Sequence, residues 1–442
     1  MARSLVPERM RVGGLQMATQ LFANEHPLTT DKDISSEAFW RKTFRERDKT
    51  FAWLRRKAPV SWHRPLEDPV LPPEIHGEAG FWAVTKAEDI RFVGLNHELF
   101  SNALGGISLR PMLPAMTQSA SFLEMDPPDH TRYRQIMSAA FTPRAVARVN
   151  AKIEERARQI VGGLVGAGDF DVVEDLSARL PMLTVADLIG VPEGLTQTFA
   201  DAGEKFIGAL TNPESRPEGV SLSEFAGEQL GILRDIGVDL VNFRRTRPGD
   251  DIATALANAQ FDGRRLSDEE ITSIMRLLSI AGNDTTKQTT SWTVLALDRN
   301  PEQRAWLLED FDGRIAGAIE EFVRYACPVL QFARTATQDV ELGGQQIRQG
   351  DKVAVFYCSG NRDEAVFEDP HRFDLSRGRT PHVGFGGGGI HYCLGNGIAK
   401  AELRALFGEI LTQLPKLQVT GEPDLLFGEF SSGIRHLSAR TN

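Results

Sequence analysis

The clearest hydrophobic pattern of the chain lies between residues 268 and 298. Apolar side chains recur there at i, i+3, i+4 and i+7, first at Ile271, Ile274, Met275 and Leu278. A capping box at 267–270 opens this stretch, and Pro301 follows it. The pattern predicts one amphipathic helix of about 30 residues, far longer than an average helix, and we expect it to be central and buried.

A polar segment, Ala281-Gly282-Asn283-Asp284-Thr285-Thr286, interrupts this pattern. Burying an acid and two hydroxyls costs free energy unless they are hydrogen-bonded, and a glycine weakens a helix interior by about 1 kcal/mol relative to alanine. A solvated face, or a threonine that bonds back to the preceding turn, is the ordinary explanation. A buried site that handles protons is the functional one.

Shorter patterns predict a small sheet beside a helical body. Proline, glycine and mixed charge in residues 1–35 indicate an irregular leader. Short strands are expected at 60–63 and 80–85, separated by a proline-rich loop. Further helices are expected at 39–58, after Asp129, at 145–165 and at 176–189.

Composition excludes some classes of protein. The 442 residues are 41% hydrophobic and 25% charged, which is ordinary for a globular protein. The net charge of -10 argues against a nucleic-acid binder, because no overall basic field is available to neutralise phosphates. No apolar run long enough to span a membrane occurs in the sequence, and the three cysteines stand singly, so we expect a cytoplasmic protein without a membrane anchor.

A glycine-rich loop at 384–395 delivers Cys393 to the start of a predicted helix. Backbone N–H groups at a helix start stabilise a thiolate, and glycines let a flat ligand approach the backbone. A phosphate cradle is the commoner use of such a loop, but this one lacks the Gly-Lys-Ser/Thr ending and a preceding apolar strand. A buried structural cysteine is the other ordinary explanation. The loop thus indicates a metal or macrocycle ligand.

With this loop, the polar segment and a Glu-x-x-Arg pair between them, the chain resembles the cytochrome P450 haem-thiolate monooxygenases. Their ligand loop reads Phe-Gly-x-Gly-x-His/Arg-x-Cys-x-Gly. Counted from the cysteine, the residues that match are Gly387, Gly389, His391, Cys393 and Gly395. Phe385 lies one residue too far from Cys393, so the loop carries one extra residue. This variant is associated with some actinobacterial members that oxidise steroids, terpenoids and methyl-branched lipids.

The resemblance implies a mostly α fold, in which a triangular helical body and a small β-rich region form a single domain over 36–442. Cys393 would be the axial ligand of the haem iron. The cofactor would lie against Ala281, Gly282, Phe385 and Gly395, where Gly282 leaves room beside it. Thr285 would stabilise bound dioxygen, and Asp284 would relay protons from solvent.

Four residues match the positions that bind the haem propionates in the family, namely His130, Arg134, Arg334 and His391. Glu321, Arg324 and Arg372 match its structural Glu-Arg-Arg network. Family alignment assigns substrate contacts to Leu277, Ile280, Val329, Phe332 and Phe430. An exposed pair or an ordinary core position is the alternative for each of these residues taken singly.

The resemblance also implies haem b, dioxygen, and electrons that come ultimately from NAD(P)H through a ferredoxin reductase and a ferredoxin. Lys400 and Arg404, with Arg132 and Arg144, are candidates for a basic ferredoxin-docking patch. A monomer that hydroxylates a lipophilic substrate is expected. A haem-thiolate peroxygenase or isomerase is the main alternative, and a non-catalytic haem carrier is the third.

Overall fold

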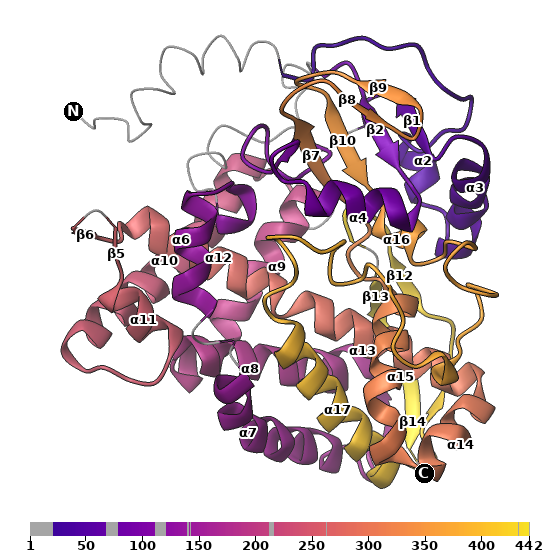
Figure 1. Cartoon of the computed structure of the whole chain (residues 1–442). Helices are drawn as coiled ribbons and strands as arrows, with labels where there is room; N and C mark the ends of the chain where they lie inside the picture. Colours follow the sequence, from indigo (N-terminus) through magenta and orange to yellow (C-terminus); the bar gives the residue numbers. More distant parts are fainter. Residues whose placement is uncertain are drawn as a thin grey trace.

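The computed structural model describes residues 21–67, 78–110, 121–138, 141, 143–211, 216–261, 263–431 and 433–441. Helices dominate, and a small sheet region lies at one corner of the molecule (Figure 1). None of the described helices is both long and apolar enough to cross a membrane. The mostly α fold that the sequence predicts is confirmed.

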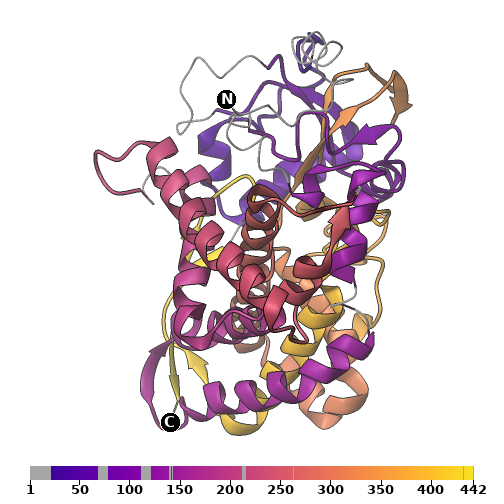
Figure 2. The ribbon, with the colours of Figure 1, turned by 90° about the vertical axis from the view of Figure 1, so that its left-hand side faces the viewer.

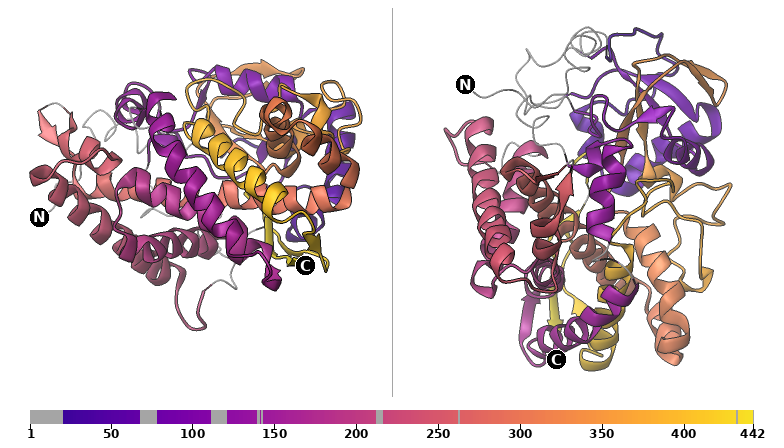
Figure 3. Two further views of the ribbon diagram at one scale, coloured as in Figure 1. Left: turned by 90° about the horizontal axis from the view of Figure 1, so that it is seen from below. Right: turned by 60° about the vertical axis from the view of Figure 1, so that its left-hand side comes forward.

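The helical body contains most of the long helices. They are α6 (Asp129–Ser138), α7 (Pro143–Gly162), α8 (Arg179–Ile189), α9 (Thr196–Thr211), α10 (Leu222–Thr246), α11 (Ile252–Asn258), α12 (Asp268–Ala281), α13 (Asp284–Arg299), α14 (Pro301–Glu309), α15 (Phe311–Ala326) and α17 (Asn396–Gln413). The helices α9, α11 and α12 pack against α10 on the side that faces the viewer in Figure 2. Seen from below, α7 and α17 run side by side (Figure 3, left).

The corner sheet has five strands in the order β1-β2-β10-β7-β3. Their bounds are β1 (Val60–His63), β2 (Phe81–Val84), β10 (Lys352–Val355), β7 (Phe332–Ala336) and β3 (Phe100–Ser101). Only the pairing of β10 with β2 is parallel among these neighbours. The expected strand 60–63 is confirmed residue for residue, and all four of its side chains are buried.

Short elements surround this sheet and the helical body. The helices are α2 (Glu37–Trp40), α3 (Phe44–Lys57), α4 (Ala87–Leu95) and α16 (Tyr357–Gly360). The strands are β4 (Gly168–Asp171), β5 (Gln260–Phe261), β6 (Arg264–Arg265), β8 (Val340–Leu342), β9 (Gln345–Ile347), β11 (Gln418–Val419), β12 (Asp424–Leu426), β13 (Gly433–His436) and β14 (Ser438–Thr441). The expected helix 39–58 is therefore two helices, α2 and α3.

The long central helix is also divided in two. Helix α12 ends at Ala281 and α13 begins at Asp284, so the prediction of one continuous helix over 268–298 is corrected. The hydroxyl of Thr285 donates to the Ala281 carbonyl over 2.9 Å and so satisfies an acceptor at the end of α12. The polar segment is thus the junction between two helices.

Residues 21–36 lie within or beside the expected irregular leader and contain no helix or strand. They are nevertheless fixed to the sheet by the fully buried carboxylate of Asp351. Asn24 donates to it over 2.9 Å, His26 lies 2.8 Å from it, and the Trp82 indole N–H donates over 2.8 Å. This part of the chain is therefore bound along the sheet.

A buried ion pair holds α15 to the segment that leads into the cysteine loop. Glu321 and Arg324 are both fully buried, with the closest N–O contact at 2.6 Å. Arg324 also donates to the carbonyls of Asn361 and Pro370, each over 2.8 Å. A charged pair with its remaining donors satisfied in this way fixes the relative positions of the segments it joins.

The third member of this network is a correction to the prediction. Arg372 is 61% exposed at its side chain and pairs with Asp374. The guanidinium that reaches Glu321 belongs to Arg377, whose Nε lies 3.6 Å from the carboxylate and whose side chain is only 10% exposed. Arg372 contributes its backbone carbonyl, which accepts from Arg324 over 3.2 Å.

Candidate functional site

The glycine-rich loop 384–395, called the thiol loop below, turns back on itself and brings Cys393 to the start of α17. The Cys393 N–H donates to the Phe385 carbonyl over 3.0 Å, and the Asn396 side chain donates to the Cys393 carbonyl over 2.7 Å. The Phe385 ring packs beside His382, with 5.7 Å between the ring centroids, and under the Lys400 ammonium. Phe385 therefore closes the loop although it lies one residue further from the cysteine than usual.

The glycines of this loop lie directly against α4. A Cβ at Gly387 would be 2.7 Å from the Ile90 carbonyl oxygen, and one at Gly389 would be 2.0 Å from the Gly94 oxygen. Gly389 also has a positive φ of +75°, which favours glycine. The longer loop is thus accommodated by backbone-to-backbone packing on α4, a contact that the spacing of the motif could not indicate.

The environment of Cys393 acts on its thiol in two directions. Burial raises the pKa of the Cys393 thiol, while the backbone N–H groups of Gly395 and Asn396 lower it. These two donors lie at the start of α17, as the helix-start argument requires. Coordination to a metal ion would hold the thiol deprotonated against the cost of burial.

Four basic side chains gather beside the loop. The rings of His130 and His391 lie 4.3 Å apart, Arg134 donates to the Tyr392 carbonyl over 2.6 Å, and Arg334 is only 5% exposed. Among the described residues, neither guanidinium forms an ion pair with an acid, and the buried nitrogens of both rings have no hydrogen-bond partner. The sequence named all four, and the structure brings them together.

Both imidazoles are held in their neutral form. Burial, helped by Arg134, lowers the pKa of His130 to about 4. Burial and then Arg334 lower the pKa of His391 to about 2. The buried guanidinium of Arg334, the half-buried one of Arg134 and two ring N–H donors without acceptors form a binding site, called the basic cradle below, for an anion with two carboxylates, because unpaired buried polar groups are costly.

By the family motif, the second wall of the site would be the junction between α12 and α13. Ala281 lies inside the helical body, yet it is exposed, and Thr285 one turn later is half-buried. The expected role of Gly282 is corrected, because a Cβ there would lie 2.4 Å from Cγ2 of Val185 on α8. Gly282 therefore permits helix packing, and Ala281 is the residue that borders open space.

Asp284 occupies the first position of α13 and is 30% exposed at its side chain. Its carboxylate lies 3.0 Å from the Nζ of Lys287, which also lies 3.2 Å from Glu204 on α9. No motif in the sequence indicated a role for Lys287 or Glu204. The i, i+3 spacing of an acid and a lysine was the available signal for the first contact, and nothing local could indicate the second.

The proposed substrate residues come from three separate segments. Phe332 and Phe430 are in ring contact with centroids 5.5 Å apart, and Val329 pairs with Ser431 through an isolated β-bridge. Leu277 and Ile280 on α12 are half-buried beside the exposed Ala281. Family alignment also points to the loop 104–113 as a substrate contact, and its residues 111–113 lie outside the described residues.

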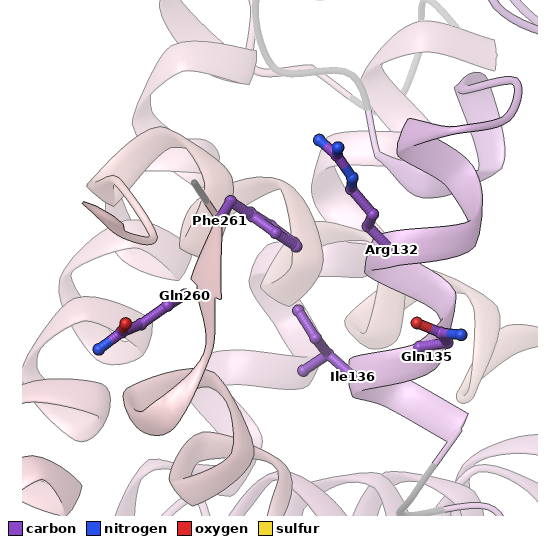
Figure 4. Close-up of a pocket in the computed structure, with 5 residues that line it drawn as sticks. All are labelled: Arg132, Gln135, Ile136, Gln260 and Phe261. Atoms are coloured by element: carbon purple, nitrogen blue, oxygen red, sulfur yellow. The ribbon is translucent and has the colours of Figure 1, made fainter. Parts of the chain in front are cut away.

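A separate open cavity of about 340 Å³ lies between α6 and β5 (Figure 4). Its lining residues are Arg132, Gln135, Ile136, Gln260 and Phe261. It contains neither Cys393 nor any of the four basic side chains. We therefore do not assign the chemistry of the site to it.

The two walls together fit the haem that the motifs imply. Cys393 offers one thiol on one side, and Ala281 leaves open space beside the helix junction on the other. The unpaired donors of His130 and His391, with Arg134 and Arg334, match the two carboxylates of protoporphyrin. The donor set thus suits a flat dicarboxylate macrocycle with a thiolate-bound iron.

The chain matches known proteins over nearly all its length. The description of the matching family is Cytochrome P450, over residues 241–424. A methyl-branched lipid omega-hydroxylase of Mycobacterium tuberculosis is 38% identical over 414 residues, which are 92% of this chain and 94% of that protein. A steroid C26-monooxygenase of Mycolicibacterium smegmatis is 37% identical over 393 residues, covering 87% and 88%.

A similar structure is also known. It is that of a Mycobacterium marinum cytochrome P450 in complex with pseudoionone, which is 44% identical and has a TM-score of 0.89, covering 94% of this chain and 100% of the other. From the thiol loop, the basic cradle and these similarities, we conclude that the chain belongs to the cytochrome P450 family, whose members bind haem and use dioxygen, and is a cytochrome P450 monooxygenase.

Proposed function

We propose that the protein hydroxylates a methyl-branched, steroid or terpenoid lipid. The single observation that carries the proposal is that four basic side chains, which form no ion pair with an acid among the described residues, gather at the loop that holds Cys393. When bound, a haem with a thiolate ligand activates dioxygen for the insertion of one oxygen atom. Cys393 would be that ligand.

The other residues of the site would orient the cofactor and handle protons. His130, His391, Arg134 and Arg334 would hold its carboxylates. The Thr285 hydroxyl donates to the Ala281 carbonyl, so its lone pairs are available to accept from a water molecule. Asp284 is partly exposed and would pass protons from solvent to that water.

The substrate class rests on similarity and on side-chain chemistry. Relatives with at least 37% identity act, by their names, on methyl-branched lipids and steroids, and the similar structure holds pseudoionone. The residues proposed to line the pocket are apolar: Leu277, Ile280, Val329, Phe332 and Phe430. An apolar lining favours a lipophilic molecule because its burial releases water from apolar surface.

The electron donor would be a ferredoxin, reduced by its reductase from NAD(P)H. The expected docking patch carries less uncompensated charge than the sequence suggested, because Lys400 pairs with Glu320, Arg404 with Asp312 and Arg132 with Asp129. Arg132 and Arg404, each 47% exposed at the side chain, stay candidate contacts. The three free cysteines favour the reducing cytoplasm as the compartment, and a monomer is proposed.

The ligand assignment is tested by the absorption of the reduced, carbon monoxide-bound protein. Cys393→His should abolish the thiolate-type spectrum, while Cys358→Ala, a buried cysteine elsewhere, should keep it. Retention of that spectrum in Cys393→His would refute the assignment.

The substrate class is tested by titrating the wild type with steroids, terpenoids, and branched and straight fatty acids. A low-spin to high-spin shift should occur with the first three and be weakest with straight fatty acids.

A further inference from the structure

A buried lysine connects the proposed proton donor to a neighbouring helix. The side chain of Lys287 is 5% exposed, and its Nζ lies 3.0 Å from Asp284 and 3.2 Å from Glu204 on α9. The two carboxylates are 30% and 60% exposed at their side chains. One enclosed ammonium is thus shared by two carboxylates that both reach solvent.

The ammonium is firmly charged. Burial alone lowers the pKa of Lys287, but Asp284 and Glu204 outweigh it, so the net pKa is raised. A buried ammonium without a counter-ion is costly, and its packed stem keeps it from following a carboxylate into solvent. The position of Lys287 therefore limits where the Asp284 carboxylate can lie.

Helix α9 packs closely on α12 near Glu204, Asp284 and Lys287. A Cβ at Gly203 would lie 2.4 Å from the hydroxyl of Ser279, so the two helices touch. The guanidinium of Arg276 lies 5.7 Å from the ring of Phe206. These contacts fix the height of Glu204 relative to the helix junction, so the sharing of Lys287 depends on the seating of α9.

We propose that Lys287 is a positioning residue that couples proton delivery by Asp284 to the seating of α9. When α9 is packed on α12, Glu204 shares the Lys287 ammonium with Asp284, and the Asp284 carboxylate is free to turn between solvent and the water held by Thr285. When Glu204 is withdrawn, Lys287 binds Asp284 alone and holds it away from that water. The inference rests on the proposed function, since it assigns Asp284 the proton-relay role.

The test compares four single variants and one double variant of the haem-loaded enzyme, with its redox partners and a substrate that it turns over. Glu204→Gln should lower the product formed per NAD(P)H consumed about fivefold and raise the solvent isotope effect on turnover, because a misplaced catalytic group loses rate steeply. Lys287→Met, which is close to lysine in shape and is flanked by carboxylates that solvent can reach, should also uncouple, because without the ammonium nothing positions the Asp284 carboxylate near the water held by Thr285. Lys287→Arg keeps the positive charge, so its coupling should be close to that of the wild type. Glu228→Gln, an exposed carboxylate on α10, should match the wild type.

The decisive comparison is the double variant. Glu204→Gln should have no further effect in the Lys287→Met background, because Glu204 acts through the ammonium. Hydrogen exchange of the α9 amides, which does not depend on turnover, should quicken about equally in both single variants. Additive losses of coupling, or unchanged coupling and exchange in Glu204→Gln, would refute the inference. The proposed function would stand after either of these two results, provided that the wild type shows a normal thiolate-type spectrum and hydroxylates the substrate.

Discussion

The imidazole rings of His130 and His391 lie 4.3 Å apart with their planes at 58°, although they come from α6 and from the thiol loop. Both rings are neutral because burial lowers their pKa values. A neutral ring offers one N–H donor without adding another buried charge. The pair therefore joins the two parts of the chain that would clamp the cofactor carboxylates.

The first prediction concerns this pair. His391→Phe keeps a ring of similar size but removes the donor, so a carboxylate that it held would lose a charge-assisted hydrogen bond. We expect haem to be lost about tenfold faster to an excess of a haem-free globin. His436→Phe, at an exposed histidine that pairs with Asp171, is the control and should release haem as the wild type does. Equal rates for the two variants would contradict the cradle.

The second prediction tests the packing of the longer loop. Gly389→Ala would add a Cβ 2.0 Å from the Gly94 carbonyl at a φ of +75°. Gly344→Ala has nearly the same φ, +76°, but no atom within 4 Å of the new Cβ. Both carry the cost of a positive φ, about 1 kcal/mol, and only the first also displaces α4. We expect a low haem content for Gly389→Ala alone, measured as the ratio of haem to protein absorbance.

Comparable haem content in these two alanine variants would show that α4 does not support the loop. The comparison is informative because backbone atoms, unlike a long side chain, cannot move aside without shifting the helix. In Gly389→Ala the thiol would be displaced from the start of α17, and the loss of haem would follow from that displacement.

The third prediction separates Arg377 from Arg372. Arg377 is nearly buried and reaches Glu321, so Arg377→Met should lower the free energy of unfolding by about 2 kcal/mol. Arg372 is mostly exposed, so Arg372→Met should unfold like the wild type. Urea denaturation followed by circular dichroism measures both. The reverse order of stability would restore the assignment made from the motif.

Local patterns predicted the elements well. Strand β1 and the start of α12 at its capping box follow from neighbouring residues, and both were correct. The break between α12 and α13 was missed because the apolar repeat continues across it. At the break the Thr285 hydroxyl satisfies the Ala281 carbonyl and Gly282 packs on Val185, and neither contact belongs to the apolar repeat.

The residues of the candidate site were named from motifs of the family, and contacts that span distant segments were missed. Those motifs name Cys393 and the four basic residues, which the structure brings together at the loop 384–395. The pairing of Glu204 with Lys287 joins positions 83 residues apart, and the choice of Arg377 over Arg372 depends on how the chain turns after α15. Neither contact produces a periodic pattern in the sequence. Many exposed acids and arginines elsewhere in the chain carry the same side chains, so the sequence does not single these pairs out.

The last prediction concerns a buried acid next to the helix junction. Glu402 on α17 is 2% exposed, and burial raises its pKa to about 8, against smaller opposing effects of hydrogen bonds with Thr184 and Thr286. In the folded protein it therefore keeps its proton at neutral pH, whereas in the unfolded chain it is ionised above about pH 4.5.

Between these two pKa values the folded state binds more protons than the unfolded state. The free energy of unfolding should thus fall as pH rises from about 5 to 8, by up to about 1.4 kcal/mol per pH unit. Glu402→Gln keeps the neutral shape and removes the titration, so its stability should vary less over this range. Urea denaturation at several pH values measures the two slopes, with Glu228→Gln as the exposed control. Parallel slopes for the wild type and Glu402→Gln would mean that Glu402 is ionised in the folded protein, and its contact with Thr286 would then place a negative charge beside the junction that carries Asp284 and Thr285.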